Sequence, residues 1–282
     1  MLRKGIALAA LGLAILASPA NASTSTKEEP RAVHFSFEGP LGKFDQAQLQ
    51  RGYKVYREVC SSCHAMSLMS FRNLGQKGGP FYDRKYPNAN DNPYVKAIAK
   101  DYQINDIDSE TGDVVQRPGT SADTFPSPFA NEAAARASNG GALPPDMSTL
   151  VKAREEGPQY IYSLLTGFKI APNGMEVPTG KHYNPYMSGD MTAFWKGDPS
   201  KVPVGGFIAM APPLEAGKVT FDDGTPSTLE QQSKDVVAFL AWVSEPKMEE
   251  RKQFGLAAMI YLLIFSVLLW FSYQRIWRNV GH

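Results

Sequence analysis

This sequence of 282 residues is poor in cysteine and histidine and carries almost no net charge. It contains 2 cysteines and 4 histidines, and its 29 basic residues nearly balance 28 acidic ones. The balanced charge gives no indication of a nucleic-acid partner. Because no cysteine lies elsewhere, all the thiol chemistry of the chain is confined to residues 60–64, which read Cys-Ser-Ser-Cys-His.

Residues 60–64 have the attachment signature of a c-type haem, in which two cysteines are separated by two residues and followed at once by a histidine. In a helical conformation Cys60, Cys63 and His64 stand at positions i, i+3 and i+4, so their side chains project from one face. Each thiol can then add to one vinyl group of haem while the imidazole reaches the iron. We therefore expect one covalently bound haem c.

Two other uses of this motif are weaker. A Cys-x-x-Cys pair can be a redox dithiol, but a thioredoxin-like βαβ pattern should then surround it, and the residues before Cys60 read as a helix. A structural zinc site needs four Cys or His ligands at zinc-finger spacing. The remaining histidines are scattered along the chain, at His34, His182 and His282.

Two apolar segments lie near the ends of the chain. Residues 1–22 have a basic start, an apolar run and a small-x-small end, which is the pattern of a cleaved signal peptide. Residues 254–273 contain no charged residue and would span about 30 Å as a helix, enough to cross a bilayer. The flanking Lys and Arg counts mildly oppose the orientation that the signal peptide implies. We take the orientation from the signal peptide. It predicts a periplasmic haem c domain at 23–253, a transmembrane helix at 254–273 and a cytoplasmic tail at 274–282.

Between these segments the pattern predicts a mainly helical domain with long loops. Asp45 is the expected N-cap of a helix over residues 46–63, and Gly52 on this helix predicts a close helix crossing. Further helices are expected at residues 133–137, 157–168 and 227–245, the last opened by a capping box of Ser227 and Glu230.

The predicted loops are long. Glycine and proline favour loops at residues 75–92 and 170–213, and the length of the second suggests that it wraps around a bound group. Residues 101–113 contain acidic residues and no basic one. That stretch is typical of a solvated loop or of a negative surface that attracts a basic partner.

A six-coordinate electron-transfer haem needs a second iron ligand, and methionine is the leading type because its thioether favours ferrous iron. Met210 stands between two alanines, which leave room for the macrocycle, and two prolines stiffen the loop after it. Met175, Met187 and His182 remain alternatives.

Residues 143–146, which read Leu-Pro-Pro-Asp, must be extended. Each proline fixes its own φ and disfavours the α conformation in the residue before it. Neither proline has an amide hydrogen, so the carbonyls are free to accept. We expect one of these carbonyls to accept a hydrogen bond from Nδ1 of His64 and so to fix the tautomer of the imidazole. We assign this role to Pro145.

The sequence resembles the cytochrome c1 family, in its alphaproteobacterial form, over most of the chain after residue 22. Besides the haem motif, the resemblance rests on residues 51–56, 135–137, 141–146, 162–167, 183–186, 210–213 and 222–226. It implies a class I c-type cytochrome domain with one C-terminal transmembrane helix. Cys60 and Cys63 would carry the haem thioethers, with His64 as proximal and Met210 as distal ligand. By the same resemblance Arg136 would lie near a haem propionate. Residues 187–206 look like an insertion relative to the family.

Members of this family are the haem subunit of ubiquinol–cytochrome c oxidoreductase, the cytochrome bc1 complex. The resemblance implies an electron-transfer subunit, not an enzyme by itself, that accepts an electron from the Rieske iron–sulfur protein and reduces a cytochrome c. It also implies cytochrome b as a partner, a dimeric complex, and a single-pass location in the bacterial inner membrane. The alternatives are a haem c subunit of another membrane complex, such as a terminal oxidase, and a membrane-anchored dithiol–disulfide oxidoreductase.

Overall fold

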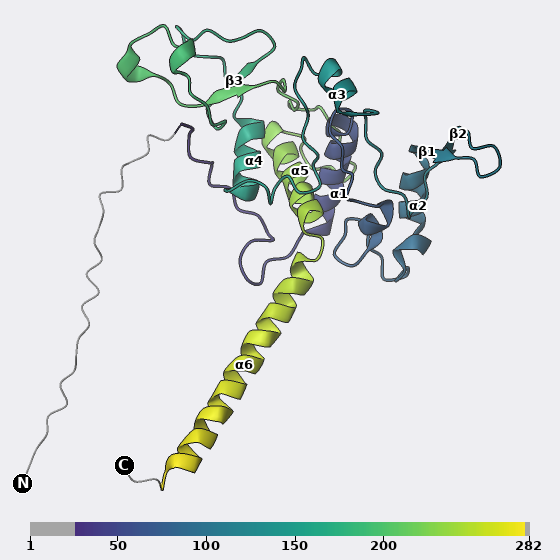
Figure 1. The fold of residues 1–282 in the computed structure, drawn as a ribbon, viewed down its shortest axis with the longest axis vertical. Helices are drawn as coiled ribbons and strands as arrows, with labels where there is room; N and C mark the ends of the chain where they lie inside the picture. Colours follow the sequence, from purple (N-terminus) through teal and green to yellow (C-terminus); the bar gives the residue numbers. More distant parts are fainter. Residues whose placement is uncertain (1–25, 280–282) are drawn as a thin grey trace, which may run out of the picture.

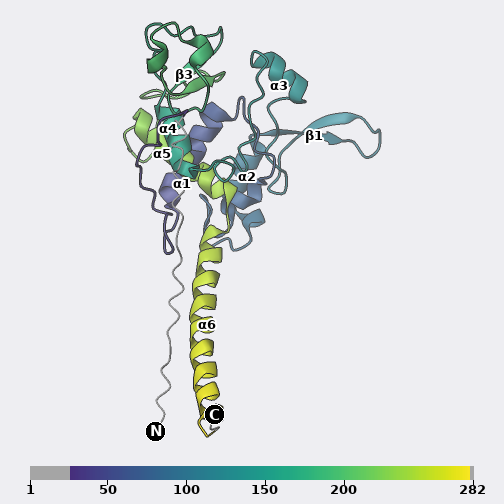
Figure 2. The ribbon, with the colours of Figure 1, turned by 60° about the vertical axis from the view of Figure 1, so that its left-hand side comes forward.

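The computed structural model describes residues 26–279 and shows a mainly helical head on one long helix (Figures 1 and 2). The predicted signal peptide, residues 1–22, lies outside the described residues. The prediction of a mainly helical domain with long loops is confirmed. The α-helices are α1 (Gln46–Val55), α2 (Pro93–Lys100), α3 (Glu132–Ser138), α4 (Gly157–Thr166), α5 (Leu229–Ser244) and α6 (Met248–Trp277).

The helix predicted over residues 46–63 forms only as far as Cys60, and its geometry changes at Tyr56. Asp45 caps α1 as expected, because its side chain accepts a hydrogen bond from an amide of the first turn at 2.7 Å. The helix continues as a π-helical turn over Tyr56–Cys60, in which the amide of Ser61 bonds to the carbonyl of Tyr56 at 2.9 Å. Apolar periodicity did not predict this wider turn, and such turns are frequent at functional sites.

In the centre of the head, α1 crosses α5, and both views place the two helices side by side. A Cβ atom on Gly52 would lie 2.1 Å from the backbone oxygen of Asp235 and 2.7 Å from Cβ of Phe239, so only glycine permits this approach. The close crossing predicted at Gly52 is confirmed. Because residues 236–243 of α5 are all buried, this helix forms the middle of the core.

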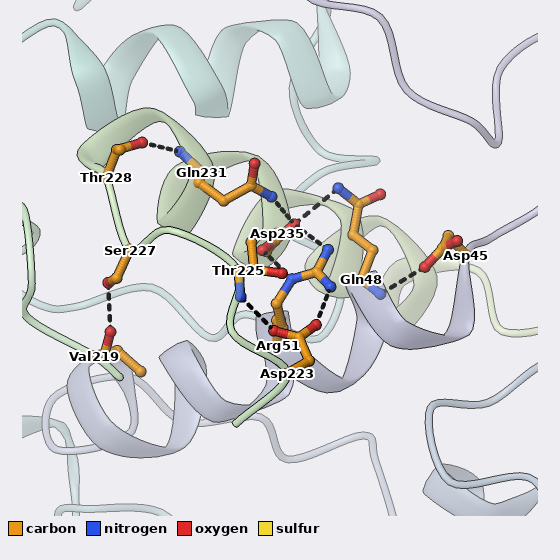
Figure 3. A network of polar contacts seen from close by, with 10 residues as sticks. All are labelled: Asp45, Gln48, Arg51, Val219, Asp223, Thr225, Ser227, Thr228, Gln231 and Asp235. Atoms are coloured by element: carbon orange, nitrogen blue, oxygen red, sulfur yellow. Dashed lines mark hydrogen bonds and ion pairs between the residues drawn. The ribbon is translucent and has the colours of Figure 1, made fainter. Parts of the chain in front are cut away.

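A buried ion pair fastens the same crossing (Figure 3). Asp235 is fully buried, and its carboxylate accepts a hydrogen bond from Nε of Arg51 at 2.7 Å. The side-chain amides of Gln48 and Gln231 donate to the same carboxylate at 2.9 and 2.8 Å. Arg51 also donates from Nη1 to Asp223 at 2.7 Å. A charge without water is stable only when it is paired and hydrogen-bonded in this way.

The start of α5 differs from the predicted capping box. Thr228, rather than Ser227, is the N-cap and accepts from the amide of Gln231 at 3.1 Å. The hydroxyl of Ser227 instead donates to the carbonyl of Val219. Glu230 therefore stands one position too early to complete a box, and that prediction was wrong.

Two antiparallel strand pairs occur outside the predicted helices, and neither pair was predicted. β1 (Gln103–Ile107) and β2 (Val114–Pro118) form a hairpin that projects from the side of the head (Figures 1 and 2). The acidic residues 101–113 are therefore strand and turn rather than an irregular loop. β3 (His182–Asn184) pairs with β4 (Gly206–Ile208) inside the region expected to lack regular structure. Both β3 and β4 are too short for an alternating pattern to identify them.

The long helix α6 leaves the head on the side opposite β3 (Figure 1). Within residues 26–279 it is the one helix long and apolar enough to cross a membrane, and its most apolar window is not buried by the head. It extends beyond the predicted segment 254–273 at both ends. Its first turns are tied to the head, because Glu249 accepts from the amide of Phe44 at 2.8 Å and Nζ of Lys252 donates to the carbonyl of Phe37 at 2.6 Å.

Candidate functional site

The cysteines and the histidine of the haem motif lie in one turn that begins at Cys60, the last residue of the π-helical segment. The amides of Cys63 and His64 both donate to the carbonyl of Cys60, at 3.1 and 2.9 Å. The hydroxyls of the two intervening serines donate back to carbonyls of the preceding turn, at 2.7 and 3.0 Å. Neither cysteine is in a disulfide, and both residues are half-buried. The backbone therefore presents both thiols and the imidazole from the same turn.

His64 is held by one ring nitrogen. Its Nδ1 lies 2.8 Å from the carbonyl oxygen of Pro145, the contact expected from the Leu-Pro-Pro-Asp sequence. A carbonyl can only accept, so Nδ1 carries the proton and Nε2 keeps its lone pair. Burial lowers the pKa of His64 and outweighs the opposite effect of the Pro145 carbonyl, which keeps the imidazole neutral. A neutral imidazole with a free Nε2 is the form that coordinates iron.

The electrostatics of Cys60 disfavour a dithiol enzyme. Burial, and to a smaller extent Cys63, raises the pKa of the Cys60 thiol to about 12. Thiol–disulfide enzymes need the opposite, a lowered pKa that yields thiolate at neutral pH. The structure therefore gives this alternative no support.

Met210 lies far along the chain from the haem motif, just after β4 (Gly206–Ile208). It is partly buried in the bend that follows β4. Met187 and His182 belong to the same lobe, which we define as residues 170–213 around the β3–β4 pair. The sulfur of Met187 accepts a hydrogen bond from the hydroxyl of Tyr160 at 3.7 Å. Four methionines outside this part of the chain are core residues, namely Met66, Met69, Met147 and Met248. No hydrogen bond of residues 26–279 joins Met210 to the haem motif, so its role stays a prediction.

Arg136 is exposed on α3, and its Nη1 donates to the carbonyl of Gly141 at 3.3 Å. Within the described residues no hydrogen bond links it to the haem motif. A cleft of about 520 Å³ lies elsewhere, between α1, α2 and the turn at residues 221–223, and its walls include Arg51, Tyr94 and Asp223. The lining of this cleft does not include residues 60–64 of the haem motif.

Asp146 is a residue near the site for which no role was predicted from the sequence. Its carboxylate accepts hydrogen bonds from Ser67 and Ser148, beside the contact between His64 and Pro145. A signal was present, because an aspartate that follows a rigid proline pair commonly accepts from the amide two residues on.

Comparison with known proteins gives a consistent result. The sequence model of the Cytochrome C1 family matches residues 35–280. This chain belongs to the cytochrome c1 family. It is 42% identical over 294 residues to the cytochrome b/c1 protein of Bradyrhizobium diazoefficiens, and the alignment covers 97% of this chain and 39% of that protein. It is 38% identical over 264 residues to cytochrome c1 of Rhodospirillum rubrum, with 88% and 87% covered. It is 41% identical over 239 residues to a mitochondrial cytochrome c1 heme protein of Arabidopsis thaliana, with 85% and 69% covered.

Members of the cytochrome c1 family carry one covalently bound haem c and take part in electron transport. The residues of this chain fit that cofactor. Two unpaired thiols stand in one turn with a neutral histidine whose Nδ1 is already engaged, so Nε2 is left for the iron. The chain covers less than half of the Bradyrhizobium protein, whose name joins cytochrome b to cytochrome c1.

Proposed function

We propose that this chain is the haem c subunit of a ubiquinol–cytochrome c oxidoreductase, and that it accepts an electron from a Rieske iron–sulfur protein and reduces a cytochrome c. The observation that carries the proposal is the single turn that joins two free thiols to a histidine oriented through Pro145. The family membership and the relative named cytochrome b/c1 support cytochrome b as a partner. By itself the chain would catalyse no reaction, and the complex would be dimeric.

Bound haem supplies a one-electron centre that alternates between ferric and ferrous iron. The chain would hold it by thioether bonds to Cys60 and Cys63. His64 would bind the iron through Nε2, and Met210 would be the second iron ligand. Arg136 remains a candidate partner for a propionate. The protein would thus tune the potential and provide the docking surface.

The proposed topology follows from the two apolar segments. Residues 23–253 would lie in the periplasm, residues 254–273 would span the inner membrane, and residues 274–282 would form a cytoplasmic tail. The bonds of Lys252 and Glu249 to the head support a membrane boundary just after them. Protease or labelling reagents applied to spheroplasts should reach the head but not the tail.

The first test is a reduced pyridine haemochrome spectrum after acid–acetone extraction of the purified protein. A c-type band that stays with the polypeptide supports thioether attachment. Haem that extracts, together with two titratable thiols, would return Cys60 and Cys63 to a dithiol role. Co-purification with cytochrome b and a Rieske protein distinguishes the proposed complex from a terminal oxidase or nitric oxide reductase.

Replacing Met210 by leucine should lower the midpoint potential by on the order of a hundred millivolts or more, within the ~0.8 V that axial ligands span. The thioether favours ferrous iron, so its loss favours the ferric state. Met187→Leu is the matched control in the same lobe. If Met210→Leu keeps its potential and its sulfur-to-iron absorption band, Met210 is not the ligand.

The tip of the β1–β2 hairpin is a candidate docking surface for a basic cytochrome c, because Glu110 and Asp113 are exposed there. Two other acids of this stretch, Asp101 and Asp106, are paired with Arg57 and Arg117. Reduction of a basic cytochrome c should slow as ionic strength rises, since salt screens such steering. A rate that does not depend on salt contradicts this assignment.

A further inference from the structure

Residues 64–68 run beside residues 145–148, and the side chain of Asp146 is one of those that join the two segments. We propose that Asp146 is a positioning residue, which fixes the Pro145 carbonyl against His64 and thereby sets the basicity of this iron ligand. The inference rests on the proposed function, because it takes His64 as the residue that binds the haem iron.

The carboxylate of Asp146 bonds to both segments. Its Oδ2 accepts from the amide and the hydroxyl of Ser67, at 2.9 and 2.7 Å. Its Oδ1 accepts from the amide of Ser148 at 2.7 Å. Ser67 stands three residues after His64, and Asp146 directly follows Pro145. The carboxylate therefore bridges the segments next to the contact between Nδ1 and the Pro145 carbonyl.

Two further hydrogen bonds keep the segments aligned. The amide of Met147 donates to the carbonyl of Ala65 at 2.8 Å, and the amide of Leu68 donates to Oγ of Ser148 at 3.0 Å. Pro145 has no amide hydrogen, so it cannot donate a backbone hydrogen bond that would fix its own position. Its position against His64 is thus set by its neighbours, and Asp146 provides the charge-assisted bonds among them.

The placement of this carbonyl has a consequence for the iron. A carbonyl that accepts strongly from Nδ1 gives the imidazole more negative character and makes Nε2 a better donor. A better donor stabilises ferric iron and lowers the midpoint potential. If the Pro145 carbonyl could rotate away, the Nδ1 proton would exchange faster with water and the potential would become more positive.

The test uses the haem-loaded full chain with Asp146→Ala and Asp146→Glu. Alanine removes the carboxylate, whereas glutamate keeps its charge and displaces it by one methylene, so a remote charge effect changes only the alanine variant. The readouts are the midpoint potential and the exchange rate of the His64 Nδ1 proton, followed by NMR in the diamagnetic ferrous state. We expect exchange about tenfold faster in both variants, because a tenfold change corresponds to the loss of roughly one charge-assisted hydrogen bond. We also expect a more positive midpoint potential in both.

Unchanged exchange in Asp146→Glu, with a shift of potential confined to Asp146→Ala, overturns the positioning role and leaves a charge effect. If the Asp146 variants fail to assemble, Ser67→Ala removes only one hydroxyl donor and should accelerate exchange to a smaller extent, while Ser127→Ala on an exposed loop should not. Unchanged exchange in Ser67→Ala then overturns the proposal. Absence of covalent haem from the unaltered protein is a different result, since it defeats the proposed function itself.

Discussion

An arginine holds two aspartates both in the helical centre of the head and in the hairpin at its side. In the centre, Arg51 contacts Asp235 and Asp223. In the hairpin, Arg117 contacts Asp106 and, at 2.7 Å, Asp123. The side chain of Asp235 is 0% exposed, whereas 46% of the Asp106 side chain is exposed. The chemistry is the same in both places, but only the central cluster holds a carboxylate that water does not reach, that of Asp235, whereas its second acid, Asp223, is 43% exposed.

The difference in burial assigns the two clusters different tasks. Around an exposed pair, water solvates whichever charge is left when its partner is removed, so the pair contributes little to stability. A buried pair has no such replacement, and removal of one partner leaves an uncompensated charge. The central cluster therefore decides whether α1 stays on α5 and delivers residues 60–64 to the core. The hairpin cluster shapes a local arm.

Replacing Asp235 by alanine should have the largest effect on stability. We expect a loss of about 3–5 kcal/mol in the free energy of unfolding, because Arg51 is then left without its buried partner. Denaturant unfolding of the haem-loaded protein measures this loss. Asp222→Ala is the control, since Asp222 pairs with Lys54 from a side chain that is 87% exposed, and its removal should leave the unfolding midpoint unchanged. Equal effects of the two substitutions would remove the distinction between the clusters.

We expect a smaller loss in the free energy of unfolding from Gly52→Ala, which tests the packing of α1 on α5 rather than its ion pair. Alanine favours an isolated helix over glycine by about 1 kcal/mol, so the intrinsic effect is stabilising. At this crossing, however, the added Cβ would lie 2.1 Å from the backbone oxygen of Asp235. We expect a net loss of about 1–3 kcal/mol from the overpacked contact.

Gly255→Ala is the matched helical control for this prediction, because nothing lies within 4 Å of a Cβ added at Gly255. The control should be neutral or slightly stabilising in thermal unfolding. If Gly52→Ala is also neutral, the two helices can separate without cost, and the crossing does not hold the haem-bearing turn in place.

The features that sequence reasoning located are those fixed by neighbours along the chain. The cap at Asp45, the close approach at Gly52 and the turn of residues 60–64 each follow from local geometry. The contact of His64 with Pro145 spans 81 residues. It was nevertheless predictable, because two successive prolines are extended and lack backbone N–H groups, so this segment offers carbonyls that only accept.

The features that sequence reasoning missed depend on which distant segments meet. Arg51 and Asp235 are 184 residues apart, and nothing near either of them identifies its partner. The pairing of β3 with β4 joins three-residue strands across a long loop. Ser227 and Thr228 are both acceptable caps by residue type, and the choice between them follows from the carbonyl of Val219, which engages Ser227. Role assignments on the distal side, Met210 above all, remain predictions for the same reason.

The smallest expected effect concerns the hairpin in acid. Arg117 holds the pKa of Asp123 well below its ordinary value of 3.8. A carboxyl group whose pKa is lowered by folding contributes stability above the unfolded pKa, and this contribution is lost as the pH falls through the folded value. Protection of the β1–β2 amides from hydrogen exchange, corrected for intrinsic rates, should therefore fall between about pH 5 and pH 2. Arg117→Met should abolish this dependence while the global unfolding midpoint at neutral pH stays unchanged. If that midpoint falls instead, as it does for Asp235→Ala, the exposed cluster is part of the cooperative core, and burial is not what separates the two arginines.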